Sequence, residues 1–186
     1  MKKTVITIAV LSWILVSCGN QTNENTTDQA EKIEQESPKD DKLSKLEREA
    51  SRLRAGGSVK SVNLEGKSAR ITYVKSYQEY KELNPQSGLT ESDLEGYWES
   101  GDAIEKALVD GSVRIMKKLD YIDTVSIELP YKGTTYTISV NKTDLEKFVG
   151  ADFPTIQNKW DETFSNPYVY DDNGRKSFFD KFGKKK

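Results

Sequence analysis

The chain of 186 residues contains no histidine and only one cysteine, Cys18. Without histidine, Ser-His-Asp and Cys-His catalysis and every histidine-based zinc site are excluded. With one cysteine the chain cannot form an internal disulfide, so its folded part must be held together by a hydrophobic core. The sequence therefore predicts no catalytic residue, no metal site and no cofactor.

A strong excess of charge of either sign is also missing. The chain has 28 Lys and Arg residues against 30 Asp and Glu residues. Residues 1–17 contain two lysines and no acid, so 26 basic and 30 acidic side chains follow them, a net charge of −4. A nucleic-acid partner normally requires a basic surface, so no nucleic acid is expected as a partner.

Long apolar runs are absent except at the N-terminus. Lys2 and Lys3 form a short positive segment, and a mostly apolar run follows at residues 5–16. This run is too short to span a bilayer, which needs about 20 apolar residues. A positive segment followed by a short apolar run is typical of a secretory signal, so residues 1–17 are predicted to be a signal peptide.

The signal ends in an aliphatic residue, a tolerant position, a small residue and a cysteine, which are Leu15, Val16, Ser17 and Cys18. These four residues resemble the lipobox of bacterial lipoproteins. The resemblance covers only the signal region, and the alternative is an ordinary signal peptide. It implies that a diacylglycerol is attached to the Cys18 thiol and that signal peptidase II cuts before Cys18.

A lipid on Cys18 places the rest of the chain outside the cytoplasm, because two or three acyl chains hold a protein firmly on a membrane. The expected location is the outer membrane of a diderm host or the outer face of the cell membrane of a monoderm host. Residues 18–41 are polar and are predicted to be a disordered tether. Its random-coil span is roughly 25 Å.

Residues 42–57 are predicted to form a short helix, because Leu43, Leu46, Ala50 and Leu53 make one apolar stripe before Gly56. The stripe either docks on the domain or forms a coiled-coil seam with a partner, and two heptads are few for a seam. Residues 58–183 are predicted to form one folded domain.

Two segments of this domain predict β-hairpins, because short runs of alternating apolar and polar residues flank a turn. The first hairpin pairs residues 59–64 with residues 69–74, and the second pairs residues 125–129 with residues 135–140. The predicted fold class is α+β, with an antiparallel sheet of two hairpins and helices mainly on one face.

A helix start follows each hairpin, at Ser76 and at Thr143, and each has a glutamate three residues later as in a capping box. The repeated order indicates either a ββα duplication or a chance recurrence of a common arrangement. Between the hairpins, Asp102 is predicted to cap a long amphipathic helix over residues 103–119. A further helix is expected after Pro154 and is expected to end at Asn166 and Pro167.

Four carboxylates cluster around the break at Ser100 and Gly101: Glu95, Glu99, Asp102 and Glu105. Paired carboxylates catalyse glycoside hydrolysis in many enzymes, so this cluster supports the alternative of a carboxylate-based hydrolase of cell-envelope glycans. The other interpretation is an acidic helix surface, since acids are favoured near helix N-termini. Residues 171–174 are interpreted as a solvated turn rather than a calcium loop.

Five aromatic residues are candidates for recognition: Tyr97, Trp98, Tyr131, Tyr168 and Tyr170. Tyr and Trp give large contacts at low entropic cost and dominate many binding hot spots. The C-terminal phenylalanines, Phe178, Phe179 and Phe182, are expected to dock on the domain, with a membrane or partner contact as the alternative.

The sequence thus predicts a lipid-anchored module that binds an envelope protein, a peptide or a glycan, and it favours a non-enzymatic role over a catalytic one. An immunity or exclusion lipoprotein fits the same features. The absence of histidine and of a free cysteine favours binding over catalysis, and strand addition to a hairpin edge is one mode of binding that this architecture offers.

Overall fold

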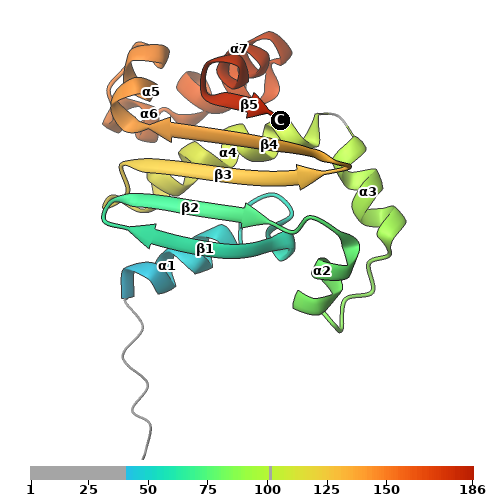
Figure 1. Cartoon of the computed structure of the whole chain (residues 1–186). Helices are drawn as coiled ribbons and strands as arrows, with labels where there is room; N and C mark the ends of the chain where they lie inside the picture. The colour runs from blue at the N-terminus through green and yellow to red at the C-terminus, as the bar shows by residue number, and fades with distance from the viewer. Residues whose placement is uncertain (1–40, 101) are drawn as a thin grey trace, which may run out of the picture. The chain divides into compact units, whose positions relative to one another are not determined.

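A computed structural model of the chain describes residues 41–100 and 102–186 (Figure 1). The predicted signal peptide, the lipobox and nearly all of the predicted tether lie outside the described residues. Within those residues, no helix is long and apolar enough to cross a membrane.

A five-stranded sheet forms the centre of the described domain. Its spatial order is β1-β2-β3-β4-β5. The strands are β1 (Val59–Glu65), β2 (Ser68–Tyr73), β3 (Thr124–Tyr131), β4 (Thr134–Asn141) and β5 (Gly183–Lys185). Both predicted hairpins are confirmed as the antiparallel pairs β1–β2 and β3–β4.

The sheet is mixed and not purely antiparallel as predicted, because β2 and β3 run parallel. Three helices lie in the chain between these strands. They return the chain to the end of the sheet at which β2 begins, so β3 runs in the same direction as β2. The α+β fold class itself is confirmed. The short strand β5, which pairs with β4, was not predicted.

Helices cover mainly one face of the sheet, as predicted. Figure 1 shows α1 and α4 behind the sheet, α2 and α3 at one end, and α5, α6 and α7 beside β4 and β5. The helical segments are α1 (Asp41–Ala50), η1 (Gly56–Ser58), α2 (Tyr77–Leu83), α3 (Glu91–Glu99), α4 (Ala103–Lys118), α5 (Lys142–Val149), α6 (Phe153–Asn158), η2 (Asp161–Tyr170) and α7 (Asp172–Phe182).

The hydrophobic core lies between the sheet and the helices α1 and α4. Alternate side chains of the central strands are buried there, among them Ile71, Ile127 and Ile138. Gly111 lies in the middle of α4, and a Cβ atom at this position would be 3.0 Å from the Cδ1 atom of Ile127. The missing side chain therefore allows α4 to pack closely on β3.

Helix α1 belongs to the same core. Leu46 and Ala50 are fully buried, and Leu53 just after the helix is also buried. Docking on the domain is therefore confirmed over a coiled-coil seam, because the apolar stripe of α1 is already covered. The folded domain accordingly includes α1 at its start.

The repeated ββα order is present along the chain, since α2 follows the first hairpin and α5 follows the second. Both hairpins bury the same face of the sheet, with Ile71 in one and Ile127 in the other. Because β2 and β3 are parallel neighbours, β1 and β3 run in opposite directions. Superposing the first hairpin on the second, with β1 on β3 and β2 on β4, therefore requires the first hairpin to be turned over. Its buried side chain, Ile71, would then point to the face opposite to that of Ile127. The order is repeated, but the units do not superpose as a duplication requires.

The two predicted capping sites have different outcomes. The Ser76 side chain accepts a hydrogen bond from the backbone N–H of Glu79, as predicted. Thr143 does not cap α5, because β4 leads directly into this helix and Asn141 accepts from the backbone N–H of Thr143 at 2.9 Å. Glu146 instead accepts from the backbone N–H of Phe153.

The C-terminal region is more helical than predicted. Segment η2 has the wide turns of a π-helix and continues through Pro167, held by the fully buried side chains of Phe164 and Val169. The segment at 171–174 is exposed to solvent, as predicted, but it is the start of α7 and not a turn, because Asp171 accepts from the backbone N–H of Gly174 at 2.7 Å. Docking of the tail is confirmed, since Phe178 and Phe179 are buried in the core.

Candidate binding pocket

Two of the predicted recognition residues, Trp98 and Tyr131, line one pocket at the end of the sheet. The pocket has a volume of about 210 Å³ and lies between α2, α3 and the turn that joins β3 to β4. Its apolar lining includes Leu94 and Pro130 as well as the two aromatic residues. Charged side chains line it too; they are Lys75, Glu91, Glu95 and Lys132.

Trp98 is held in place by other aromatic rings. It is buried, and its ring meets that of Tyr73 on β2 edge-on, with the ring centroids 5.7 Å apart. Tyr97, an exposed side chain, also lies edge-on to Trp98, with the ring centroids 4.9 Å apart. The helix that carries both residues begins at a capping box formed by Thr90 and Asp93. Trp98 is thus fixed between sheet and helix before any ligand binds.

Polar contacts tie the β3–β4 turn to α3. The Tyr131 hydroxyl donates to the Glu99 carboxylate at 3.1 Å, and the Lys132 ammonium group lies 2.6 Å from the same carboxylate. Hydrogen bonds from Lys132 and Tyr131 hold the pKa of Glu99 below its ordinary value. Lys132 adopts a left-handed backbone conformation with φ of 46°, beside Gly133 in the turn. These contacts give the pocket a preformed rim.

The four clustered carboxylates do not form one site. Glu95 and Glu99 pair with Lys132, whereas Asp102 and Glu105 face Arg175. A glycosidase needs one carboxyl group with a raised pKa as its acid, and the pKa of Glu99 is shifted in the opposite direction. No group of residues that could hold a metal ion occurs in the part of the chain that the structure describes.

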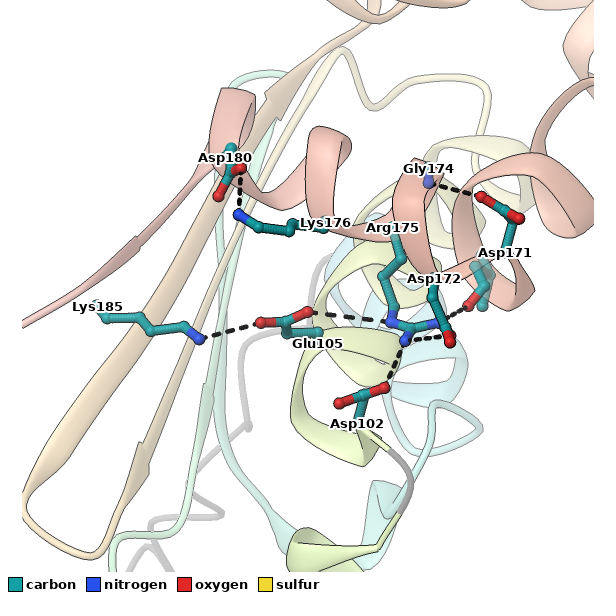
Figure 2. Close-up of polar contacts among 10 residues, drawn as sticks. Asp102, Glu105, Asp171, Asp172, Gly174, Arg175, Lys176, Asp180 and Lys185 are labelled. Carbon is teal, nitrogen blue, oxygen red and sulfur yellow. Dashed lines mark hydrogen bonds and ion pairs between the residues drawn. The ribbon is translucent and has the colours of Figure 1, made fainter.

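Arg175 forms the second polar cluster, in a cleft of about 530 Å³ next to α7 (Figure 2). Its side chain is only 2% exposed. The guanidinium group lies 2.5 Å from Asp102 and 2.8 Å from Asp172, and it donates to the Val169 carbonyl at 3.0 Å. The contacts join α4, η2 and α7, so Arg175 has a structural role.

Asp102 does not cap α4 with its side chain, contrary to the prediction. Its backbone is left-handed, with φ of 57°, and its carboxylate points to Arg175 instead. Glu105 on α4 accepts from Lys185 on β5 at 3.0 Å, which adds the edge strand to the cluster. Four acidic and four basic side chains line the cleft, and this balance gives no preference for a charged ligand.

Sequence reasoning did not find Arg175. A signal was present, because Arg175 lies three, four and seven residues before Phe178, Phe179 and Phe182 and so shares their face of α7. A charged residue in an otherwise apolar stripe is buried only when it is paired.

The other two candidate residues lie away from the pocket. Tyr168 packs in an aromatic cluster with Phe148 and Phe178, at centroid distances of 5.4 and 5.9 Å. Tyr170 is 59% exposed and accepts a hydrogen bond from Arg54 at 3.2 Å. The predicted recognition residues therefore divide among a pocket, a core cluster and a separate surface.

No family model, curated protein or solved structure matches this chain. The pocket must therefore be interpreted from its own chemistry. It combines a fixed indole ring, an apolar wall and a charged rim, and such concave sites with a few polar groups are typical of ligand binding.

Proposed function

We propose that the protein is an extracytoplasmic lipoprotein, anchored to a membrane by a lipid on Cys18, whose domain binds an envelope protein, a peptide or a glycan. The residues around Cys18 support the anchor, because a positive segment, an apolar run and a lipobox-like tetrapeptide occur in that order. Cys18 is the only cysteine of the chain and stands where the lipid chemistry requires it.

The pocket over Trp98 is the observation that carries the binding function. Trp98 and Tyr131 offer ring surface, and Lys75 and Glu91 offer polar contacts at the rim. A volume of about 210 Å³ suits one side chain of a peptide or one sugar ring rather than a large cofactor. Binding is favoured over hydrolysis, because Glu95 and Glu99 are both paired with Lys132 and the pKa of Glu99 is lowered.

The anchor is tested by labelling cells with a fatty-acid analogue. The wild-type protein and the Tyr170→Ala variant should both carry the label, and the Cys18→Ser variant should carry none. Label that remains on Cys18→Ser would show that the lipid is elsewhere, and an unlabelled wild-type protein would refute the anchor.

The pocket is tested by cross-linking the intact lipoprotein in native membranes and identifying captured proteins and sugars. A Leu94→Glu variant places a charge in the pocket, and its specific capture should fall at least roughly tenfold, as loss of a central contact predicts. Leu83→Glu, the same change at an exposed leucine that does not line the pocket, should capture as the wild type does. Both variants are first compared with the wild type by thermal unfolding, and equal capture by a folded Leu94→Glu variant would exclude the pocket.

A further inference from the structure

A groove with a positively charged lining lies between α1 and α4, on the helix-covered side of the domain. Its volume is about 250 Å³, and its charged lining consists of Arg52, Arg114, Lys118 and one acid, Glu49. Lys117 is next to it and lies 4.3 Å from the ring centre of Trp160. Together with Arg54, the cations Arg52, Arg114, Lys117 and Lys118 form what we call the basic face.

Two acids of this region, Asp110 and Glu49, lie beneath the cations. The Asp110 side chain is 5% exposed and accepts two hydrogen bonds from Arg114, at 2.7 and 3.0 Å. Glu49 is 16% exposed and pairs with Arg52, whose side chain is 64% exposed. Asp161 is an exposed acid close enough to act on Arg114 and Lys117, so it offsets part of the charge of a surface that is otherwise mainly positive.

One cation of the basic face, Arg54, is incompletely paired within the domain. The Nε atom of Arg54 is buried and has no hydrogen-bond partner, and its nearest acid, Asp110, is 3.8 Å away. Burial lowers the pKa of Lys117, and the charges of Arg114 and Lys118 lower it further. Like charges are thus crowded together, and an anion from outside would relieve their repulsion.

The basic face is a segregation of charge and not a general excess. Residues 41–186 contain 24 basic and 24 acidic side chains, so the domain as a whole is neutral. The predicted tether ends where α1 begins, and the chain supplies Arg52 and Arg54 directly after this helix. Tyr170 extends the same surface, with its ring 5.8 Å from the Arg54 guanidinium, and tyrosine is enriched at the headgroup level of membranes.

We propose that the basic face rests on the anionic lipid headgroups of the membrane that anchors the chain. This inference rests on the proposed lipid anchor, which keeps the domain within roughly 25 Å of the bilayer on average. Each Lys or Arg near an anionic surface strengthens binding roughly fivefold. The tether adds to this by raising the effective concentration of the surface. The pocket over Trp98, at the end of the sheet, stays open in this orientation.

The test uses the chain from residue 18 onward with Cys18→Ser, so that no lipid contributes and failure leaves the anchor experiments unaffected. Flotation measures its binding to vesicles of equal parts phosphatidylglycerol and phosphatidylcholine. Binding is expected to these vesicles, to decrease with added salt, and to be absent with phosphatidylcholine alone. A wild-type protein that does not bind the anionic vesicles would overturn the proposal.

Two triple variants separate the basic face from net charge. Arg52→Gln, Lys117→Gln and Lys118→Gln together remove three cations of the basic face, and binding should fall about 100-fold. Arg70→Gln, Lys184→Gln and Lys186→Gln remove the same charge from the opposite face of the sheet and should leave binding nearly unchanged. Equal losses in the two triple variants would refute a specific face.

Two further results would also contradict the proposal. Displacement from the vesicles by inorganic phosphate, beyond that caused by chloride at equal ionic strength, would assign the groove to a free anion. If only a form with Glu31→Gln, Glu34→Gln and Glu36→Gln bound the vesicles, the acidic tether would be the occupant of the basic face.

Discussion

The guanidinium group of Arg175 lies 2.5 Å from the carboxylate of Asp102, 73 residues earlier in the chain. Asp102 precedes α4 at the position of a helix cap, yet its left-handed backbone directs the carboxylate to α7. The pair therefore joins the C-terminal helix to the central helix through one nitrogen of the buried guanidinium group, whereas the Nε atom of Arg175 has no hydrogen-bond partner.

Replacing Arg175 with methionine should lower the free energy of unfolding by about 2 kcal/mol, because hydrogen bonds from a buried charged group are lost and its acidic partners are left facing one another. Urea unfolding measures the effect. The control is Lys176→Gln, at the residue after Arg175. It removes an exposed ion pair with Asp180 and should change stability by less than about 0.5 kcal/mol. Equal changes in the free energy of unfolding for the two variants would show that Arg175 has no structural role.

Phe178→Ala should destabilise the protein by about 3 to 5 kcal/mol, since a fully buried ring is removed from the core. Its ring contacts those of Phe148, Phe164 and Phe182 at centroid distances between 4.7 and 5.6 Å. Tyr170→Ala, which removes an exposed ring, is the control. A Phe178→Ala protein as stable as this control would mean that the tail is not docked in solution.

Two helical glycines should respond differently to alanine. Gly96→Ala in α3 meets open space and should stabilise the protein by about 1 kcal/mol through helix propensity. Gly111→Ala in α4 should lose this gain, because the new Cβ atom lies 3.0 Å from Ile127 in a closely packed core. Thermal unfolding of both variants measures the difference, and an equal gain at Gly111 would contradict the close packing of α4 on β3.

The pKa of Glu79 is below its ordinary value of 4.5, because Lys60 and the backbone of Lys75 donate hydrogen bonds to the carboxylate. The folded state therefore binds this proton less well than the unfolded state. Glu79 stabilises the fold above about pH 4.5, and this contribution is lost as the pH falls through the lower, folded-state pKa.

Glu79→Gln should accordingly be less stable than the wild type at neutral pH, and the two proteins should converge as the pH falls below 4.5. Urea unfolding at a series of pH values measures this. Glu65→Gln, at the exposed end of β1, serves as the control. A stability difference between Glu79→Gln and the wild type that stayed constant with pH would exclude the lowered pKa.

Local patterns in the sequence were sufficient for most of the elements. Alternation predicted β1 to β4, and Ser76 predicted the start of α2, because these signals depend on neighbouring residues. The parallel pairing of β2 with β3 depends on how three intervening helices pack, which no local pattern encodes. Strand β5 consists of a glycine and two lysines and forms because β4 offers an unpaired edge.

The sequence indicated some of the residues that line the pocket, but it did not indicate where in the fold the pocket lies. Composition indicated Trp98 and Tyr131 as recognition residues, and tertiary packing decided that these two meet while Tyr168 joins the core. The carboxylates near Gly101 looked like one cluster along the chain. The structure separates them, because Lys132 and Arg175, both distant in sequence, each attract two of them.

The parallel pairing of β2 with β3 has a consequence for the order of folding. Each hairpin can close within microseconds, but an isolated two-stranded hairpin is barely stable in water. The parallel ladder between the hairpins pairs Ser68 with Thr124. The central sheet can therefore form only after the long chain segment between these two residues has closed into a loop, which is slow. If the chain is exported from its N-terminus, as we propose, the first hairpin leaves the membrane before β3, the strand that pairs with β2, is available. The domain would acquire its core only after α4 and β3 had followed.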